Sequence, residues 1–355
     1  MRSRLTIQTL DLHAGGEPLR LVTAGYPPLP HAPILERRRW VREHADHVRR
    51  AICWEPRGHR DMYGAVLAPP FRPDADVAVL FMHNEGYSTM CGHGILALTA
   101  GLLEEGLMPA TAPETTVRFE TPAGLVVARA AVRPSDGSVE VDDVRFTNVP
   151  AYLAARDLAL RPDGLAFAGA AAERGTLRVD IGFGGAYYGI VDAAELGLRV
   201  VPAATDALTR AGSAVTELLR RDHTPAHPEA ADLGFVYGTI IVDREPGSSP
   251  DGRALDADLR NVTVFADAEV DRSPCGTGTC ALLAQGHARG ELAVGTEIAN
   301  ASLTGAIFRG RIDGLARLGP HDAIFPSVAG RGYVTGYQTL VVDTRDDLGA
   351  GFVLR

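Results

Sequence analysis

The sequence predicts an α/β protein built from two similar halves, and three observations lead to this prediction. The chain has 355 residues, a length that suits two domains of ordinary size. Apolar runs of strand length alternate along it with segments that have helical spacing. A Cys-Gly-x-Gly motif occurs twice, and a helix-forming segment follows each copy. We therefore expect two pseudo-symmetric domains, one holding residues 1–150 and 343–355 and the other residues 151–342.

The first half carries helix, strand and paired-strand signals in turn. Residues Glu36–Arg50 predict an exposed helix rich in arginine, and Val77–Met82 is an apolar run of strand length. Helical spacing of apolar residues extends from Ile95 to Leu107 and ends near a glycine and a proline. Residues Thr115–Val132 alternate like two strands joined by a turn over Thr121–Gly124.

The second half repeats this style. Residues Arg178–Val191 predict a strand that contains Gly182, Gly184 and Gly185. These glycines lack the full dinucleotide-binding fingerprint, so we interpret them as points of close backbone packing. The other predicted elements are a helix over Asp206–Arg221, strands over Val236–Asp243 and Val262–Ala266, and a helix over Cys280–Leu292.

Composition and charge exclude several cofactors and partners. The formal net charge is −9 and arginine is scattered, which argues against nucleic acid or an anionic membrane as a partner. All 35 basic residues are Arg. Without a lysine the chain cannot hold pyridoxal phosphate as a lysine aldimine or form any other Schiff base through a lysine. We expect no cofactor, no metal and a small-molecule substrate as partner, with a homodimer as the candidate assembly.

The N-terminal 18 residues contain no apolar run of the signal-peptide type, and no stretch of the chain is apolar for long enough to span a bilayer. A cytoplasmic protein with reduced thiols is therefore the expectation.

Each Cys-Gly-x-Gly motif places a thiol where a helix begins, at Cys91–Gly94 and at Cys275–Gly278. A helix N-terminus leaves backbone N–H groups unpaired and carries a positive partial charge, which lowers the pKa of a thiol. Two such thiols on opposite faces of a substrate would form an acid–base pair, in which one removes a proton and the other delivers one. The backbone amides that could bind the substrate carboxylate are those of Gly92, His93, Gly276 and Thr277.

Other uses of the four cysteines predict other patterns. Cys53 and Cys280 lie in apolar stretches, where we expect them to pack in the core. The spacing from Cys275 to Cys280 matches neither the C-x2-C of zinc sites nor the C-x-x-C of redox proteins. One Cys-Gly-x-Gly motif alone would suit a plain turn, and it is the second copy that favours a function. A non-catalytic amino-acid-binding protein and a thiol redox protein remain the alternatives from other classes.

The residues around both cysteines resemble the proline racemase family, which contains proline racemases, 4-hydroxyproline 2-epimerases and trans-3-hydroxy-L-proline dehydratases. The resemblance covers nearly the whole chain. It implies a two-domain α/β fold like that of diaminopimelate epimerase, in which each domain wraps a curved sheet around a central helix. It also implies an active site in the cleft between the domains. The segments that carry it are Asp11–Pro18, Glu55–Gly64, Asn84–Gly94 and Asp271–Gly278.

The same resemblance implies roles for individual residues. Cys91 and Cys275 match the catalytic positions of the family, and Asp271 and His93 match the positions that hold the nitrogen of the substrate ring. Taken alone, Asp271 could equally cap the helix that follows it. The residues that match the carboxylate-binding turns are Gly92, His93, Gly276 and Thr277.

The signals for a subgroup differ between the two motifs. Residues Glu55–Val66 and His83–His93 resemble the trans-3-hydroxy-L-proline dehydratases, which typically carry Thr at the second catalytic position. This chain has Cys275 there, as racemases and epimerases do. We expect dehydration of trans-3-hydroxy-L-proline to Δ1-pyrroline-2-carboxylate together with 2-epimerisation to cis-3-hydroxy-D-proline. The alternative is a proline racemase or a 4-hydroxyproline 2-epimerase.

Overall fold

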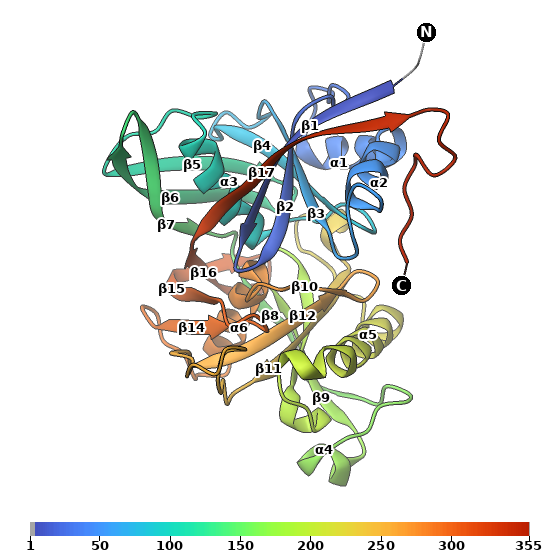
Figure 1. The fold of residues 1–355 in the computed structure, drawn as a ribbon. Helices are drawn as coiled ribbons and strands as arrows, with labels where there is room; N and C mark the ends of the chain where they lie inside the picture. The colour runs from blue at the N-terminus through green and yellow to red at the C-terminus, as the bar shows by residue number, and fades with distance from the viewer. Residues whose placement is uncertain (1–3, 355) are drawn as a thin grey trace. The chain divides into compact units, whose positions relative to one another are not determined.

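The structure, a computed structural model, describes residues 4–354, which form two units (Figure 1). The first unit holds the described residues up to Phe146 and from Arg331 onward, and the second holds Thr147–Gly330. Our predicted boundaries lay at residues 150 and 342. The return to the first unit comes earlier because β17 (Gly332–Asp343) pairs along its length with β1 (Arg4–Ala14). Within residues 4–354, no helix is long and apolar enough to cross a membrane.

The first unit is a mixed sheet with three helices. Hydrogen-bonded ladders join its strands in the order β17, β1, β2, β3, β4, β5 and β6. Besides β1 and β17, its elements are β2 (Glu17–Ala24), α1 (Ile34–His44), α2 (Asp46–Cys53), β3 (Tyr63–Ala68), β4 (Val77–His83), α3 (Gly92–Glu104), β5 (Glu114–Thr121), β6 (Gly124–Ser135) and β7 (Ser138–Thr147).

The second unit is also a mixed sheet, with ladders in the order β8, β9, β10, β11, β12, β14, β15 and β16. Its elements are β8 (Tyr152–Leu160), α4 (Gly169–Arg174), β9 (Leu177–Phe183), β10 (Tyr187–Asp192), η1 (Ala193–Leu196), η2 (Pro202–Ala204), α5 (Thr205–Asp222), η3 (Ala231–Leu233), β11 (Val236–Asp243), β12 (Leu259–Phe265), β13 (Glu269–Val270), α6 (Gly276–Ala288), β14 (Glu297–Ala301), β15 (Ile307–Leu318) and β16 (His321–Gly330).

The two units share one pairing pattern. From β17 to β6, successive ladders are antiparallel, antiparallel, parallel, antiparallel, parallel and antiparallel. From β8 to β15, the second unit repeats this series. In both units the second parallel ladder is a crossover through the helix that follows a cysteine, β4–α3–β5 and β12–α6–β14. This repetition confirms the predicted pseudo-symmetry.

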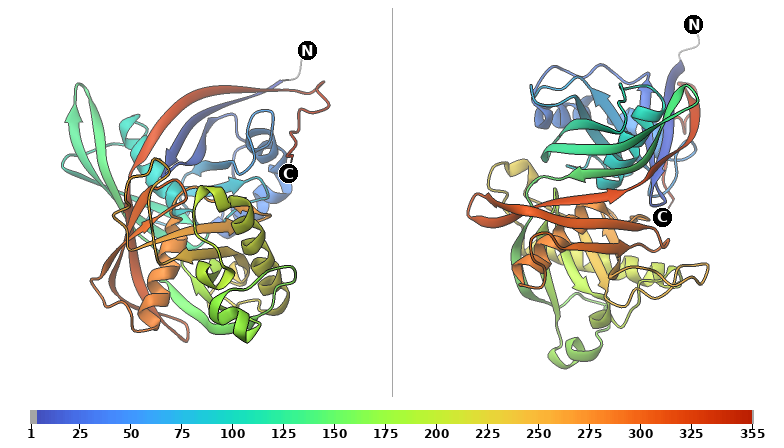
Figure 2. Two further views of the ribbon diagram at one scale, coloured as in Figure 1. Left: turned by 60° about the horizontal axis from the view of Figure 1, so that its bottom comes forward. Right: turned by 90° about the vertical axis from the view of Figure 1, so that its left-hand side faces the viewer.

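The helices α3 and α6 are the central helices of their units. Each has 13 residues, and α3 is buried from Gly92 to Leu103 and α6 from Gly276 to Gly286. A helix buried on every side must carry apolar or small residues on every side, as both do. In the first unit, α3 packs against β1, β2, β6 and β17, and the views show how strongly the paired β1 and β17 bend (Figures 1 and 2). In the second unit, α6 packs against β8, β9, β10, β15 and β16.

The predicted exposed helix over Glu36–Arg50 is wrong in two respects. The segment forms two helices, α1 and α2, which meet at Ala45. It is also amphipathic, because Val41, Ala45, Val48 and Ile52 join a core cluster with strand residues such as Ile7. The local density of arginine concealed this apolar stripe.

Candidate active site

Cys91 caps the N-terminus of α3 in a buried setting. The residue is 4% exposed, and its Sγ accepts a hydrogen bond from the backbone N–H of Gly94 at 3.3 Å. Gly94 makes this contact feasible, since a Cβ there would lie 2.9 Å from that Sγ and 2.5 Å from Cε1 of Phe81 on β4. The last glycine of the motif therefore leaves room for both the sulfur and the strand behind it.

An imidazole is the nearest ionisable neighbour of the Cys91 sulfur in this turn. Nδ1 of His93 lies 3.3 Å from Sγ, and Nε2 lies 3.6 Å from it. The ring is 4% exposed and packs edge-on against Tyr63, with 5.0 Å between ring centroids. An imidazole N–H that points at sulfur stabilises the thiolate. The local arrangement therefore suits Cys91 as a base.

The buried side chain of Asn84 ties the end of β4 to the loop that precedes β3. Its Nδ2 donates hydrogen bonds to the carbonyl oxygens of Cys53 at 2.8 Å and His59 at 3.1 Å. Its Oδ1 accepts one from the backbone N–H of Asp61 at 2.5 Å. The sequence motif contains Asn84, but the sequence analysis assigned it no role. Its partners are 23 to 31 residues away in the chain, beyond the reach of a local pattern.

Cys275 caps α6 with the same sulfur contact and a different backbone. Its Sγ accepts a hydrogen bond from the N–H of Gly278 at 3.3 Å, but its φ is 58°. A residue with a side chain pays of order 1–2 kcal/mol for this left-handed conformation. Two hydrogen bonds hold the turn: Cys275 N–H donates to Oγ of Ser273 at 3.1 Å, and Ser273 N–H donates to Oδ1 of Asp271 at 2.8 Å.

Burial, and after it the charge of the nearby Asp271 carboxylate, raises the pKa of the Cys275 thiol to about 12. Hydrogen bonds from Thr263, Thr277 and the Gly278 amide act in the opposite direction and are outweighed. The expectation that the helix N-terminus lowers the pKa of this thiol is therefore wrong for Cys275, because desolvation opposes the charged form more strongly. Without a ligand, Cys275 is a protonated thiol at neutral pH and is suited to act as an acid.

Asp271 is buried, and burial raises its carboxyl pKa to about 6 even though hydrogen bonds from Ser273 and Cys275 lower it. The residue does not cap α6, because Cys275 is the N-cap and Asp271 instead accepts from Ser273 within the preceding turn. Of the two interpretations made from the sequence, helix capping is thus excluded. A buried carboxylate beside a thiol remains, and such a group suits an ammonium ligand.

A buried tyrosine supports the second turn. The hydroxyl of Tyr188, on β10, lies 2.7 Å from Oγ1 of Thr277, which in turn lies 3.6 Å from Sγ of Cys275. Burial raises the pKa of Tyr188 well above its usual value, so the hydroxyl keeps its proton. The sequence analysis missed Tyr188, because nothing in the local pattern links β10 to the start of α6.

Gly182 and Gly184 are points of close packing, as predicted, and the element that they approach is α6. A Cβ on Gly184 would lie 2.2 Å from the carbonyl oxygen of Thr277, and one on Gly182 would lie 3.2 Å from Cβ of Ala281. These two glycines let the sheet approach the first turn of the helix. They therefore position the turn without contributing chemistry to it.

The first turns of both central helices retain free donors. No described residue accepts a hydrogen bond from the backbone amides of Gly92, Gly276 or Thr277. Such amides at a helix N-terminus bind anions. Each cysteine therefore lies beside donors that suit a carboxylate.

The two other cysteines, Cys53 and Cys280, lie in the core. Cys53 and Cys280 are fully buried, as predicted for core residues. Burial raises the pKa of the Cys280 thiol to about 12, which opposes the thiolate that disulfide exchange with Cys275 requires. Within residues 4–354, no group of three or more His, Cys, Asp and Glu side chains is arranged to hold a metal ion.

Comparison with known proteins places these motifs in a wider group. The family model described as Proline racemase matches residues 9–353. The chain is 41% identical over 357 residues to a trans-3-hydroxy-L-proline dehydratase from Burkholderia ambifaria, and the alignment covers 100% of both chains. It is also 41% identical, with the same coverage, to a 3-hydroxyproline 2-epimerase from Burkholderia multivorans.

The fold of this chain also matches that of a solved structure. A hydroxyproline epimerase from Agrobacterium vitis, with bound trans-4-OH-L-proline, matches with a TM-score of 0.87 and 31% identity. The match covers 100% of this chain and 97% of that chain.

Proposed function

The chain belongs to the proline racemase family, and from that premise we propose that it dehydrates trans-3-hydroxy-L-proline to Δ1-pyrroline-2-carboxylate and epimerises the same substrate at C2 to cis-3-hydroxy-D-proline. The observation that carries the proposal is that a buried cysteine caps each central helix beside amides that suit a carboxylate. Relatives of equal identity are named for the two reactions, which agrees with a chain that performs both.

In the proposed complex, Cys91 and Cys275 flank one substrate molecule. The amides of Gly92, His93, Gly276 and Thr277 bind the substrate carboxylate. Asp271, ionised above a pKa of about 6, binds the ring ammonium together with His93. The ammonium also offsets the negative charge of Asp271, which adds to burial in keeping the Cys275 thiol protonated, so substrate binding makes this thiol a better acid.

Dehydration needs only the Cys91 side of the substrate. In trans-3-hydroxy-L-proline the carboxylate and the hydroxyl lie on opposite ring faces, so the C2 hydrogen and the hydroxyl share a face. The Cys91 thiolate removes that hydrogen, and the electron pair left at C2 forms the C2–C3 double bond as the C3–O bond breaks. The new thiol gives its proton to the departing hydroxyl, which leaves as water. The enamine then tautomerises to Δ1-pyrroline-2-carboxylate.

Epimerisation needs both thiols. After Cys91 has removed the proton, Cys275 delivers its own proton to C2 from the opposite face. The hydroxyl at C3 stays in place, and the product is cis-3-hydroxy-D-proline. Cys91 ends as a thiol and Cys275 as a thiolate, which is the state required for the reverse reaction. The carbanion draws stabilisation from the amides that hold the carboxylate.

A second candidate reaction is racemisation of proline or 2-epimerisation of 4-hydroxyproline. The match to a hydroxyproline epimerase with bound trans-4-OH-L-proline favours it. These substrates carry no hydroxyl at C3, so Cys91 cannot expel water and only inversion at C2 remains.

The experiment is incubation of the protein in heavy water with trans-3-hydroxy-L-proline, trans-4-hydroxy-L-proline and L-proline in turn, followed by NMR. We expect loss of water and C2 deuteration with inversion for the first substrate. Inversion at C2 of trans-4-hydroxy-L-proline and L-proline, with no reaction of trans-3-hydroxy-L-proline, would instead establish the second candidate reaction. Absence of C2 exchange in all three substrates would leave a non-catalytic binding protein.

Cofactor, assembly and compartment are tested separately. We expect activity to survive dialysis against EDTA, and a loss restored by zinc would contradict the two-thiol mechanism. For a homodimer we expect about twice the chain mass of 37.6 kDa in light scattering. Cell fractionation tests the expected cytoplasmic location.

A further inference from the structure

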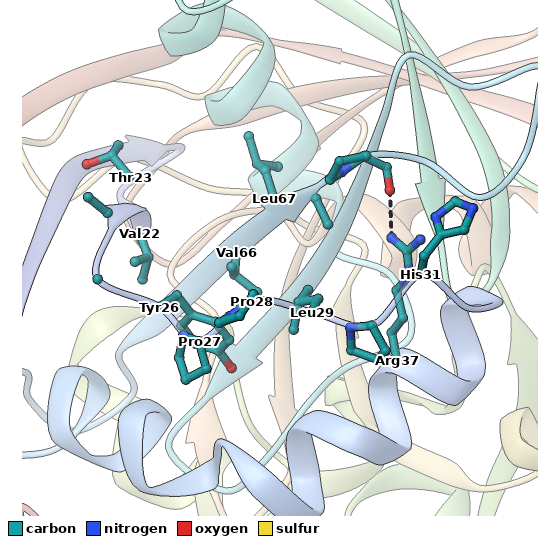
Figure 3. A pocket seen from close by; sticks show the side chains of 15 residues that line it. Val22, Thr23, Tyr26, Pro27, Pro28, Leu29, His31, Arg37, Val66 and Leu67 are labelled. Carbon is teal, nitrogen blue, oxygen red and sulfur yellow. Dashed lines mark hydrogen bonds between the residues drawn. The ribbon is translucent and has the colours of Figure 1, made fainter.

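The first unit contains a cavity of about 360 Å³ that none of the cysteine-motif residues lines (Figure 3). It lies between the end of β2, the loop leading to α1, and the end of β3. Its volume is within the range of sites for small ligands, roughly 300–1,000 Å³.

One wall of this cavity is a rigid loop. Pro27, Pro28 and Pro30 fix their own backbone torsions, so the loop has few conformations to lose on binding. The loop begins at Gly25, whose φ is 87° and where a Cβ would lie 2.2 Å from the carbonyl oxygen of Thr6. The cavity is therefore formed before any ligand enters.

A buried cation lines the same cavity. Arg37 of α1 is 1% exposed, and its Nη1 donates a hydrogen bond to the carbonyl oxygen of Pro69 at 2.6 Å. Its Nε is buried and has no hydrogen-bond partner. Among the described residues, no carboxylate forms an ion pair with it. In Figure 3 its guanidinium lies on the right of the view with His31, away from Tyr26 and Pro27 at the lower left.

Arg260, in the second unit, shows how this chain satisfies a buried guanidinium that is purely structural. It is also 1% exposed. Its three nitrogens donate to the carbonyl oxygens of Ser302 at 2.9 Å, Ser248 at 3.0 Å and Leu303 at 2.8 Å. Arg37 has one such bond, and its buried Nε has no partner. A buried charge left in this state is costly, so the site calls for a further acceptor.

We propose that this cavity binds a small monocarboxylate with an apolar body. A guanidinium N–H that donates to a carboxylate oxygen forms a charge-assisted hydrogen bond, which is stronger than one to a neutral acceptor. One buried cation balances one negative charge, which disfavours phosphates of higher charge. Tyr26, Leu29 and Val66 supply the apolar surface for the body of the ligand.

The test is titration calorimetry with cyclohexanecarboxylate and with its uncharged isostere, cyclohexanecarboxamide. We expect the wild-type protein to bind one more equivalent of the carboxylate than of the amide, or to bind the carboxylate at least about tenfold more tightly. The amide cannot form the charge-assisted hydrogen bond, and the loss of such a bond implies a difference of this size. Arg37→Gln should weaken binding of the carboxylate by about tenfold or more and leave binding of the amide unchanged. Arg42→Gln, at an exposed position on the same helix, is the matched control and should bind like the wild type.

Leu67→Trp provides a second test, because it fills the cavity and leaves Arg37 in place. It should abolish binding of the carboxylate even if Arg37→Gln does not fold, and circular dichroism checks the fold of each variant. Equal affinity of wild type and Arg37→Gln for the carboxylate would place the ligand elsewhere and overturn the proposal. So would the absence of binding to the wild type at roughly 10 mM ligand, a concentration that detects even weak sites.

Discussion

The two cysteine turns share a backbone plan and differ in what surrounds the sulfur. Both cysteines cap a 13-residue buried helix and accept an amide hydrogen bond at 3.3 Å. Beside Cys91 stands the imidazole of His93, whereas beside Cys275 stand the hydroxyl of Thr277 and the negative charge of Asp271. An imidazole N–H favours thiolate, and a carboxylate favours thiol. The comparison shows that two turns with the same backbone plan surround the sulfur with different groups, and the proposed roles of Cys91 as base and Cys275 as acid depend on this difference.

Replacement of the base should have the largest effect. Cys91→Ala removes the group proposed to take the C2 proton, and general base catalysis is worth about 10²–10⁴-fold, so both dehydration and epimerisation should fall by about 10²–10⁴-fold. Solvent exchange at C2 of the L substrate, followed by NMR in heavy water, measures this loss. Exchange that persists near the wild-type rate would mean that Cys91 is not the base and that the two turns do not differ as described.

Asp271→Asn tests the charge that distinguishes the second turn. The change removes the proposed partner of the substrate ammonium, and kcat/KM should fall by about 10²-fold, as for loss of a charge-assisted contact. In the wild type, kcat/KM should decline as pH falls through about 6, where the carboxyl of Asp271 takes up a proton. Asp271→Asn should lack this acidic limb. An identical limb in both proteins would assign it to another group.

Tyr188→Phe should affect one reaction more than the other. Without its hydroxyl, Thr277 loses the contact that holds it near Sγ of Cys275, so epimerisation should fall by about tenfold while dehydration changes little. The matched control is Tyr187→Phe, which removes a buried hydroxyl of the same strand that contacts Tyr152. The readout is the ratio of the two products. A parallel loss of both, equal to that of Tyr187→Phe, would reduce Tyr188 to a structural residue.

The smallest effect concerns stability. The folded-state pKa of Asp271, about 6, lies above its ordinary value of 3.8, so the folded state holds this proton more tightly than the unfolded state. Stability from this group is therefore present below pH 3.8 and is lost as pH rises through 6. Above that range Asp271→Asn should be more stable than the wild type by about 3 kcal/mol, and below it the difference should vanish. Urea denaturation at several pH values measures the difference.

The sequence was sufficient for the parts of the fold that repeat or follow local periodicity. The two cysteine motifs predicted both α3 and α6, and the alternation over Thr115–Val132 predicted the β5–β6 hairpin, in which Thr121 pairs with Gly124. Local patterns sufficed here because each element is defined by neighbours in the chain.

The sequence was insufficient where distant segments meet. The contact between Tyr188 and Thr277 joins β10 to α6, and the raised pKa of Cys275 depends on how deeply the folded chain buries it. The buried state of Arg37 was likewise hidden, because its neighbours in the sequence are charged and its cavity is formed by β2 and β3. Burial depends on the tertiary structure, and a local pattern does not contain it.

The central claim is that Cys91 alone suffices for dehydration, whereas epimerisation also needs Cys275. The direct test is product analysis of Cys275→Thr by chiral chromatography with trans-3-hydroxy-L-proline as substrate. Cys275→Ser serves as the second variant, because Ser is not β-branched and tolerates the φ of 58° better than Thr. A hydroxyl is a far weaker acid than a thiol, so we predict that cis-3-hydroxy-D-proline disappears while Δ1-pyrroline-2-carboxylate still forms. If both products decline together in both variants, Cys275 takes part in the loss of water and the division of labour between the two turns is wrong.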